Sequence, residues 1–190
     1  MLQFWIVRSG ITEFERQGRV LGTLDVPLHL DAAKEIDDII HQSSGQPINA
    51  VYTSPRQSSI ETAEQLCAAW GLRYKPSELL QNIDLGLWQG LLFEDVKRKQ
   101  PKVFRQWQEH PETVCPPEGE MLQSARERID IFLIKIYKKY KSGVIVIVVP
   151  DPFAAILASV LHQTQIKDML PTGPEHRESI QIISPALTNA

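Results

Sequence analysis

Arg8, Ser9 and Gly10 form a short segment with the groups that a ligand-binding or catalytic site needs. They follow directly on the apolar segment 2–7, which predicts a strand. In α/β proteins, ligands bind at the carboxyl ends of parallel strands. Arg8 would therefore present a fixed cation to a cleft, beside a small hydroxyl and the bare backbone of a glycine.

Strand-like and helix-like patterns alternate around this segment. Segments 48–53, 72–75, 144–149 and 179–183 predict four further strands, and 144–149 is apolar on both faces, as in a central parallel strand. Apolar residues at helical spacing predict helices within 30–40, 55–70, 122–140 and 153–161, with two short helices at 93–99 and 103–108. The order predicts an α/β fold: a three-layer sandwich with a mostly parallel central sheet and helices on both faces.

Composition limits the classes of function. The 190 residues are 43% hydrophobic and 23% charged, with a net charge of -3, so neither nucleic acid nor a membrane is an expected partner. No run is long enough to span a bilayer, and the opening residues lack the features of a secretory signal. Two cysteines without metal-type spacing suit a reducing compartment. We expect a cytoplasmic monomer or homodimer without metal or cofactor.

Several short motifs, in order along nearly the whole chain, resemble one family. Arg8 to Phe14 resembles an Arg-His-Gly-x-Thr-x-Trp opening, and Gly18 to Leu28 resembles the loop that follows it. Further matching segments are 52–55, 61–63, 83–90 and 116–120. Together they resemble the histidine phosphatase superfamily, which includes the cofactor-dependent phosphoglycerate mutases. The resemblance implies a single domain over 1–190, with a small helical cap inserted at about 79–119.

The resemblance also implies a pocket for phosphoryl transfer. In the family, a histidine attacks phosphorus, arginines and a second histidine bind the phosphoryl oxygens, and a carboxylic acid protonates the leaving group. The matching positions of this chain hold Ser9 for the nucleophile, Asp151 for the second histidine, Ser58 for an arginine, Asn82 for the acid and Glu15 for an asparagine. Of the matched pocket positions, only Arg8 keeps the family's residue type.

The charge of this pocket is reversed relative to the family. The resemblance implies that Arg8 lies with Glu15 and Asp151, where the family has two arginines and two histidines around one acid. Two unit charges about 4 Å apart interact by roughly 4 kcal/mol at an effective dielectric constant near 20. We therefore expect the pocket to repel phosphate, and phosphatase activity to be lost.

Each of these residues also has a purely structural interpretation. Asp151 before Pro152 is typical of a helix N-cap with proline at the first helical position. Arg8 is expected to pair with Glu15 or Asp151, and Ser9 and Asn82 to be small polar fillers. A helix that begins at Ser54-Pro55 would point Arg56 away from Ser58, so Arg56 does not replace the missing arginine.

The leading hypothesis is a pseudoenzyme, in which the phosphatase fold serves as a binding or regulatory scaffold for a protein partner. The segment 79–108 holds more large apolar side chains than a small cap needs. The expected partner surface consists of Leu87, Trp88, Phe93 and Trp107.

Two alternatives remain at the level of sequence. One is a phosphomonoesterase that uses Ser9 or water, or a metal-assisted hydrolase in which Glu15 and Asp151, with Asn82 and Asp84, supply oxygen ligands. The other is a sensor of a cationic or zwitterionic small molecule, because the pocket carries more carboxylates than cations.

Overall fold

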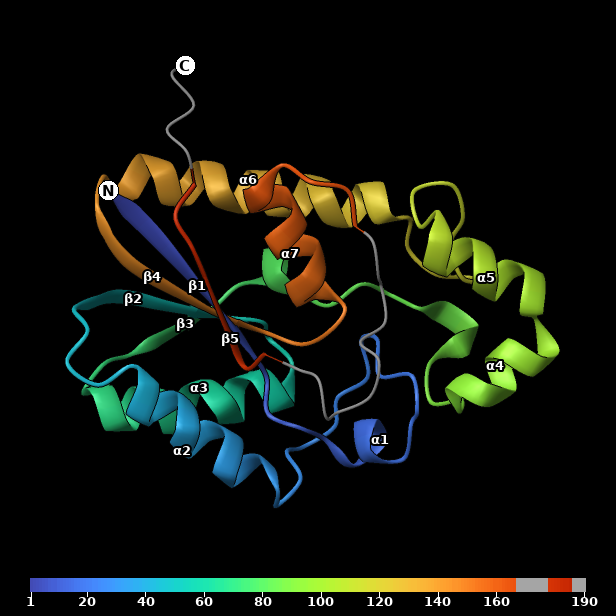
Figure 1. Cartoon of the computed structure of the whole chain (residues 1–190), viewed down its shortest axis with the longest axis horizontal. Coiled ribbons are helices and arrows are strands. Elements are labelled where there is room, and N and C mark those ends of the chain that lie inside the picture. Colours follow the sequence, from blue (N-terminus) through green and yellow to red (C-terminus); the bar gives the residue numbers. More distant parts are fainter. Residues whose placement is uncertain (167–177, 186–190) are drawn as a thin grey trace.

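A five-stranded sheet lies at the centre of the computed structural model, which describes residues 1–166 and 178–185. Its strand order is β3-β2-β4-β1-β5 (Figure 1). The strands are β1 (Leu2–Arg8), β2 (Ile48–Thr53), β3 (Tyr74–Pro76), β4 (Gly143–Val149) and β5 (Ile180–Ile183). The first four are parallel, and β5 pairs antiparallel with β1 at one edge. The predicted mostly parallel α/β fold is confirmed.

Helices cover both faces of this sheet. Figure 1 shows α2 (Ala32–Gln42) and α3 (Gln57–Trp70) on one side, and α6 (Leu122–Lys139) and α7 (Phe153–His162) on the other. Strand β4 contributes to the core on both faces, as its apolar sequence predicts. Its residues Ile145, Ile147 and Val149 pack toward α6 and α7, and the alternate valines pack toward α2 and α3.

The chain between β3 and α6 forms short helices beside the sheet. They are η1 (Glu78–Leu80), η2 (Gly86–Trp88), α4 (Phe93–Lys99) and α5 (Pro101–Glu109), while a single turn, α1 (Glu13–Arg16), follows β1. The predicted 93–99 helix is confirmed. The predicted 103–108 helix begins earlier because Pro101, with its fixed φ, suits the first helical turn.

Two tryptophans of this region are core residues, which corrects part of the predicted partner surface. Trp88 and Trp107 are each only 1% exposed, with ring centroids 5.5 Å apart in an edge-to-face arrangement, and Trp88 also contacts Phe104. Such buried side chains hold the short helices together and offer no surface to a partner. Leu87, at 57% exposed, remains accessible, and Phe93 is half-buried.

Among the described residues, no helix combines the length and apolar character needed to cross a membrane.

Candidate functional site

The ends of β1 and β4 bring Arg8 and Asp151 together. The two strands are parallel neighbours in which Arg8 is level with Val149, so both side chains reach the same edge of the sheet. Arg8 Nη1 donates to Asp151 Oδ2 at 2.6 Å, and the side chains are only 16% and 7% exposed. This is a short, charge-assisted hydrogen bond in a largely desolvated place. Of the two predicted partners for Arg8, Asp151 is confirmed.

Asp151 does not cap the helix that follows it, so the capping prediction is wrong. Helix α7 begins at Phe153, with Pro152 as its N-cap residue and without a side-chain cap bond from that residue. The first amide of α7, that of Phe153, donates instead to Asn82 Oδ1 at 3.3 Å. The Asp151 carboxylate is thus engaged by Arg8, while Asn82 provides the acceptor that a capping side chain supplies.

Ser9, at the nucleophile position, is bonded to helix α3. Its hydroxyl lies 2.6 Å from the hydroxyl of Ser59, and the next amide, that of Gly10, donates to Thr62 Oγ1 at 3.0 Å. A serine hydroxyl needs an adjacent base to become a useful nucleophile. Another hydroxyl is not such a base, so this contact holds Ser9 in place without activating it.

Helix α3 starts later than predicted, so Arg56 lies just before the helix rather than within it. The backbone is still extended at Arg56 (φ -76°, ψ 147°), and α3 begins at Gln57 rather than at Ser54-Pro55. The carboxylate of Asp25 accepts the amide of Gln57 at 2.9 Å and lies 3.9 Å from Arg56 Nη1. Ser58, at the position of the family's arginine, is buried in the first turn. Arg56 is therefore paired with the 24–28 loop.

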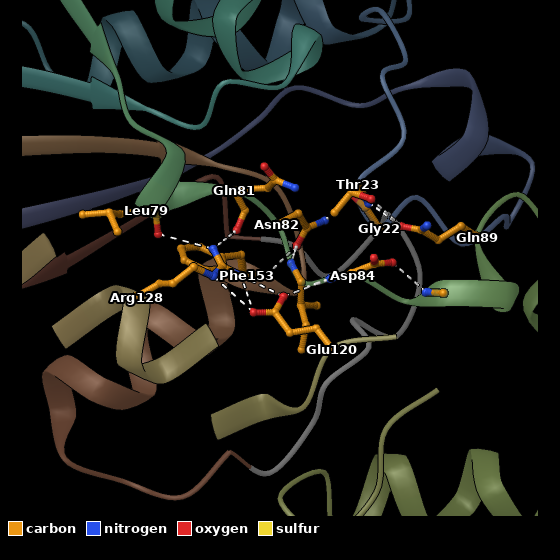
Figure 2. A network of polar contacts seen from close by, with 12 residues as sticks. Gly22, Thr23, Leu79, Gln81, Asn82, Asp84, Gln89, Glu120, Arg128 and Phe153 are labelled. Atoms are coloured by element: carbon orange, nitrogen blue, oxygen red, sulfur yellow. Dashed lines mark hydrogen bonds and ion pairs between the residues drawn. The ribbon is translucent and has the colours of Figure 1, made fainter. Parts of the chain in front are cut away.

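Asn82, at the position of the family's acid, is fully buried and makes four hydrogen bonds (Figure 2). Its Nδ2 donates to the carbonyls of Gly22 (2.9 Å) and Asp151 (2.8 Å), and its Oδ1 accepts from the amides of Ile83 (3.0 Å) and Phe153 (3.3 Å). The prediction of a small filler is wrong, since the side chain joins the loops that contain Gly22, Ile83 and Asp151. A carboxylate could not replace it, because a carboxylate only accepts hydrogen bonds.

Sequence reasoning missed Arg128, which fixes the segment that carries Asn82. Figure 2 shows its guanidinium between Glu120 and the backbone next to Asn82. It forms a bidentate pair with Glu120, from Nε to Oε1 at 3.1 Å and from Nη2 to Oε2 at 2.9 Å, and its Nη1 donates to the carbonyl of Gln81 at 2.7 Å. Glu120 also accepts the amide of Asp84 at 3.2 Å. The sequence feature that could have indicated this role is Glu120, which lies in the matched 116–120 motif and precedes α6 by two residues.

Glu15 has a local structural role. Thr12 and Glu15 form a capping box at the start of α1: the carboxylate accepts from the amide and the hydroxyl of Thr12, each at 2.9 Å, and the Glu15 amide donates to that hydroxyl at 3.3 Å. The ion pair that Arg8 makes within the described part of the chain is with Asp151, not with Glu15.

None of the described histidines occupies a sequence position that the resemblance assigns to catalysis. His29 contacts Arg16 and Asp31 on the surface, and His41, His110 and His162 lie at the C-terminal ends of α2, α5 and α7. His176 is outside the described residues. Burial raises the pKa of the Cys67 thiol to about 11, so this cysteine is not a ready nucleophile. Within residues 1–166 and 178–185, no group of three or more metal-binding side chains converges.

Comparisons with known proteins agree with this geometry at the level of fold and family. The sequence profile of the histidine phosphatase superfamily (branch 1) matches residues 4–185. The chain is 30% identical to phosphoserine phosphatase 1 of Hydrogenobacter thermophilus over 148 residues, which cover 78% of the chain and 70% of that protein. It is 28% identical to phosphoglycerate mutase-like protein 4 of Arabidopsis thaliana over 146 residues, covering 75% of the chain and 64% of the relative.

Solved structures show the same fold. YhfR of Bacillus stearothermophilus superposes with a TM-score of 0.83 at 22% identity, over 97% of this chain and 91% of that one. A mycobacterial glucosyl-3-phosphoglycerate phosphatase superposes with a TM-score of 0.78 at 20% identity, over 87% of this chain and 81% of that one. With the profile match over most of its length, this chain belongs to the histidine phosphatase superfamily.

Proposed function

We propose that this chain is a pseudoenzyme of the histidine phosphatase superfamily, which uses the fold as a binding or regulatory scaffold for a protein partner. The observation that carries the proposal is the 2.6 Å bond between Arg8 and Asp151. The one cation retained from the family's pocket is engaged by a carboxylate that stands where the resemblance implies a cationic or neutral histidine.

The chemistry of the other positions supports the same conclusion. Transfer through a phosphohistidine needs a nitrogen nucleophile, and the matching residue is Ser9, whose hydroxyl is bonded to Ser59. Protonation of a leaving group needs an acid, and the matching residue is the amide Asn82, with all four hydrogen bonds directed to the backbone. Nucleophile, electrostatic stabilisation and acid are thus replaced together.

The hydrolase alternative is less well supported by the arrangement. A metal site would need oxygens of Asn82 and Asp84, but Asn82 Oδ1 accepts two amides and Asp84 Oδ1 accepts the amide of Gly86 at 2.8 Å. A sensor of a cationic or zwitterionic molecule is less well supported too, because the Glu15 carboxylate accepts from Thr12 and the Asp151 carboxylate pairs with Arg8.

Calorimetric titration with orthophosphate, orthovanadate and phosphoserine tests the proposal. We expect no saturable binding up to concentrations of about 10 mM, because the Asp151 carboxylate repels an anion from Arg8. Even a Kd of 1 mM would need a binding free energy of about -4.1 kcal/mol. Sodium chloride at matched ionic strength is the control for screening. Saturable binding at one site per chain that Arg8→Gln abolishes would contradict the proposal.

The same titration separates the alternatives. One-site binding of Mg²⁺ or Ca²⁺ that Asp151→Asn abolishes would favour the metal-assisted hydrolase. One-site binding of ethanolamine, lysine or another amine with the same dependence on Asp151 would favour the sensor.

A further inference from the structure

The outer face of α6 carries an apolar pair that the fold leaves exposed. Ile131 and Ile134 are 47% and 53% exposed, on the face of the helix opposite to its core residues. The buried residues of α6 are Leu122, Ala125, Ile129, Phe132, Leu133 and Ile136. Figure 1 shows α6 along the outer side of the molecule, on the far side of the sheet from α2 and α3.

Opposite charges flank this pair on the same stripe of the helix. The stripe consists of Glu127, Ile131, Ile134 and Lys138, which are separated by four, three and four residues. All four side chains are exposed. A 4-3-4 spacing keeps side chains in one narrow line along an α-helix and is the seam spacing of coiled coils. The stripe therefore reads acid, isoleucine, isoleucine, base.

We propose that α6 pairs antiparallel with α6 of a second copy of this chain to form a homodimer. A two-fold axis between Ile131 and Ile134 places each of them against the other isoleucine of the second copy. The same axis places Glu127 opposite Lys138 of the second copy, twice per dimer. A two-fold contact needs a self-complementary surface, and this stripe is one.

The charges also select the orientation. A parallel pair in the same register would place Glu127 against Glu127 and Lys138 against Lys138, and like charges at facing positions destabilise a helix pair. Only the antiparallel pair matches every charge with its opposite. The interface is small, because the 18 residues of α6 extend about 27 Å at 1.5 Å per residue. We therefore expect a reversible dimer, of the class with small interfaces and modest affinity.

Sedimentation velocity of the full chain between about 5 and 500 μM tests the pairing, a range chosen around micromolar Kd values. The wild type is expected to shift from monomer to dimer as concentration rises. Glu127→Lys and Lys138→Glu each create two like-charge contacts per dimer, and each is expected to weaken self-association at least about 10-fold. Lys139→Glu is the matched control: it makes the same charge change at an exposed neighbour that points about 100° away from the stripe, and it is expected to leave association unchanged.

Mixing the two variants gives the sharpest result. In a dimer of one Glu127→Lys chain and one Lys138→Glu chain, both flanking contacts join opposite charges again. The mixture is therefore expected to dimerise with near wild-type affinity, as is the double variant that carries both changes. Circular dichroism and the Tm of each variant verify that it is folded.

Three results would overturn the pairing. The wild type could be monomeric over the whole range, or dimeric with no response to either charge change. Binding of the stripe to a helix of a different protein, with no self-association, would also reject the second copy as the occupant.

Discussion

Replacement of Asn82 by aspartate is expected to lower the free energy of unfolding by about 3–5 kcal/mol at neutral pH, the range for an uncompensated buried charge. The substitution keeps the shape of the side chain and exchanges its amide nitrogen for an oxygen. That oxygen would face the carbonyls of Gly22 and Asp151, which now accept from Nδ2 at 2.9 and 2.8 Å. Two donors are lost, and a charge is buried against two carbonyl dipoles.

Urea unfolding at several pH values measures this effect. Burial next to acceptors raises the folded-state pKa of the introduced carboxyl above its unfolded value. The loss of stability is therefore largest above that raised pKa and becomes smaller as the pH falls, because a protonated acid can again donate one hydrogen bond.

Asn49→Asp is the matched control for this prediction. The amide oxygen of Asn49 accepts from the amide of Val144 at 2.7 Å, and the residue is exposed. A carboxylate can make that contact, so we expect a change within about 0.5 kcal/mol, as for ordinary surface substitutions. Equal effects at the two positions would show that the Asn82 amide does not hold the loops together.

Asp151→Asn is expected to lower the free energy of unfolding by about 2–4 kcal/mol, somewhat below the full range for breaking a buried ion pair because Arg8 is partly exposed. The change leaves the Arg8 guanidinium, 16% exposed, without the carboxylate now at 2.6 Å. In a double-mutant cycle with Arg8→Met, the double variant should be more stable than the sum of the single losses implies. A coupling energy near zero would show that the pair does not stabilise the fold.

The same variant also tests whether Asp151 keeps phosphate away from Arg8, as the proposed function requires. With the carboxylate gone, the Arg8 guanidinium loses the ion pair that it makes at the ends of β1 and β4. We expect orthophosphate to raise the Tm of Asp151→Asn but not that of the wild type, because a ligand that binds only the folded state stabilises it. An equal rise in both proteins would mean that Asp151 does not exclude the anion.

The sequence allowed prediction of the fold and of the residues around the site. Strand positions followed from apolar runs, and β2 and the core strand β4 were predicted within one residue. Arg8 and Asp151 were expected together because the resemblance to the histidine phosphatases places both in one pocket. The strand positions depend on the periodicity of apolar residues, which can be read directly from the sequence.

Properties decided by tertiary contacts were not predictable in this way. Ser54-Pro55 has the local signature of a helix start, yet Asp25 from a distant loop caps α3 at Gln57. Asp151-Pro152 has the same signature, yet the carboxylate has a stronger partner in Arg8. Trp88 lies in a segment rich in large apolar side chains, which predicted an exposed patch, yet it packs against Trp107, nineteen residues away. In each case a long-range partner overrides a correct local preference.

The hydrogen bonds of Asn82, at the position where the resemblance implies an acid, also limit how a complete phosphatase site could be built. Family chemistry would call for glutamate at this position, but glutamate supplies none of the donors that Gly22 and Asp151 now receive. A variant with Ser9→His, Ser58→Arg and Asp151→His keeps Asn82 and is the better test of the scaffold. Without a general acid, its rate is expected to be about 10²–10⁴-fold below that of a complete site.

Steady-state phosphate release from p-nitrophenyl phosphate and from phosphoserine decides whether phosphoryl transfer is lost. The wild type is measured beside Ser9→Ala and the triple variant. We predict that the wild type and Ser9→Ala both stay at the buffer rate, with and without Mg²⁺, while the triple variant rises above it. Wild-type turnover that disappears in Ser9→Ala would contradict the pseudoenzyme and show that this pocket carries out a different phosphatase chemistry.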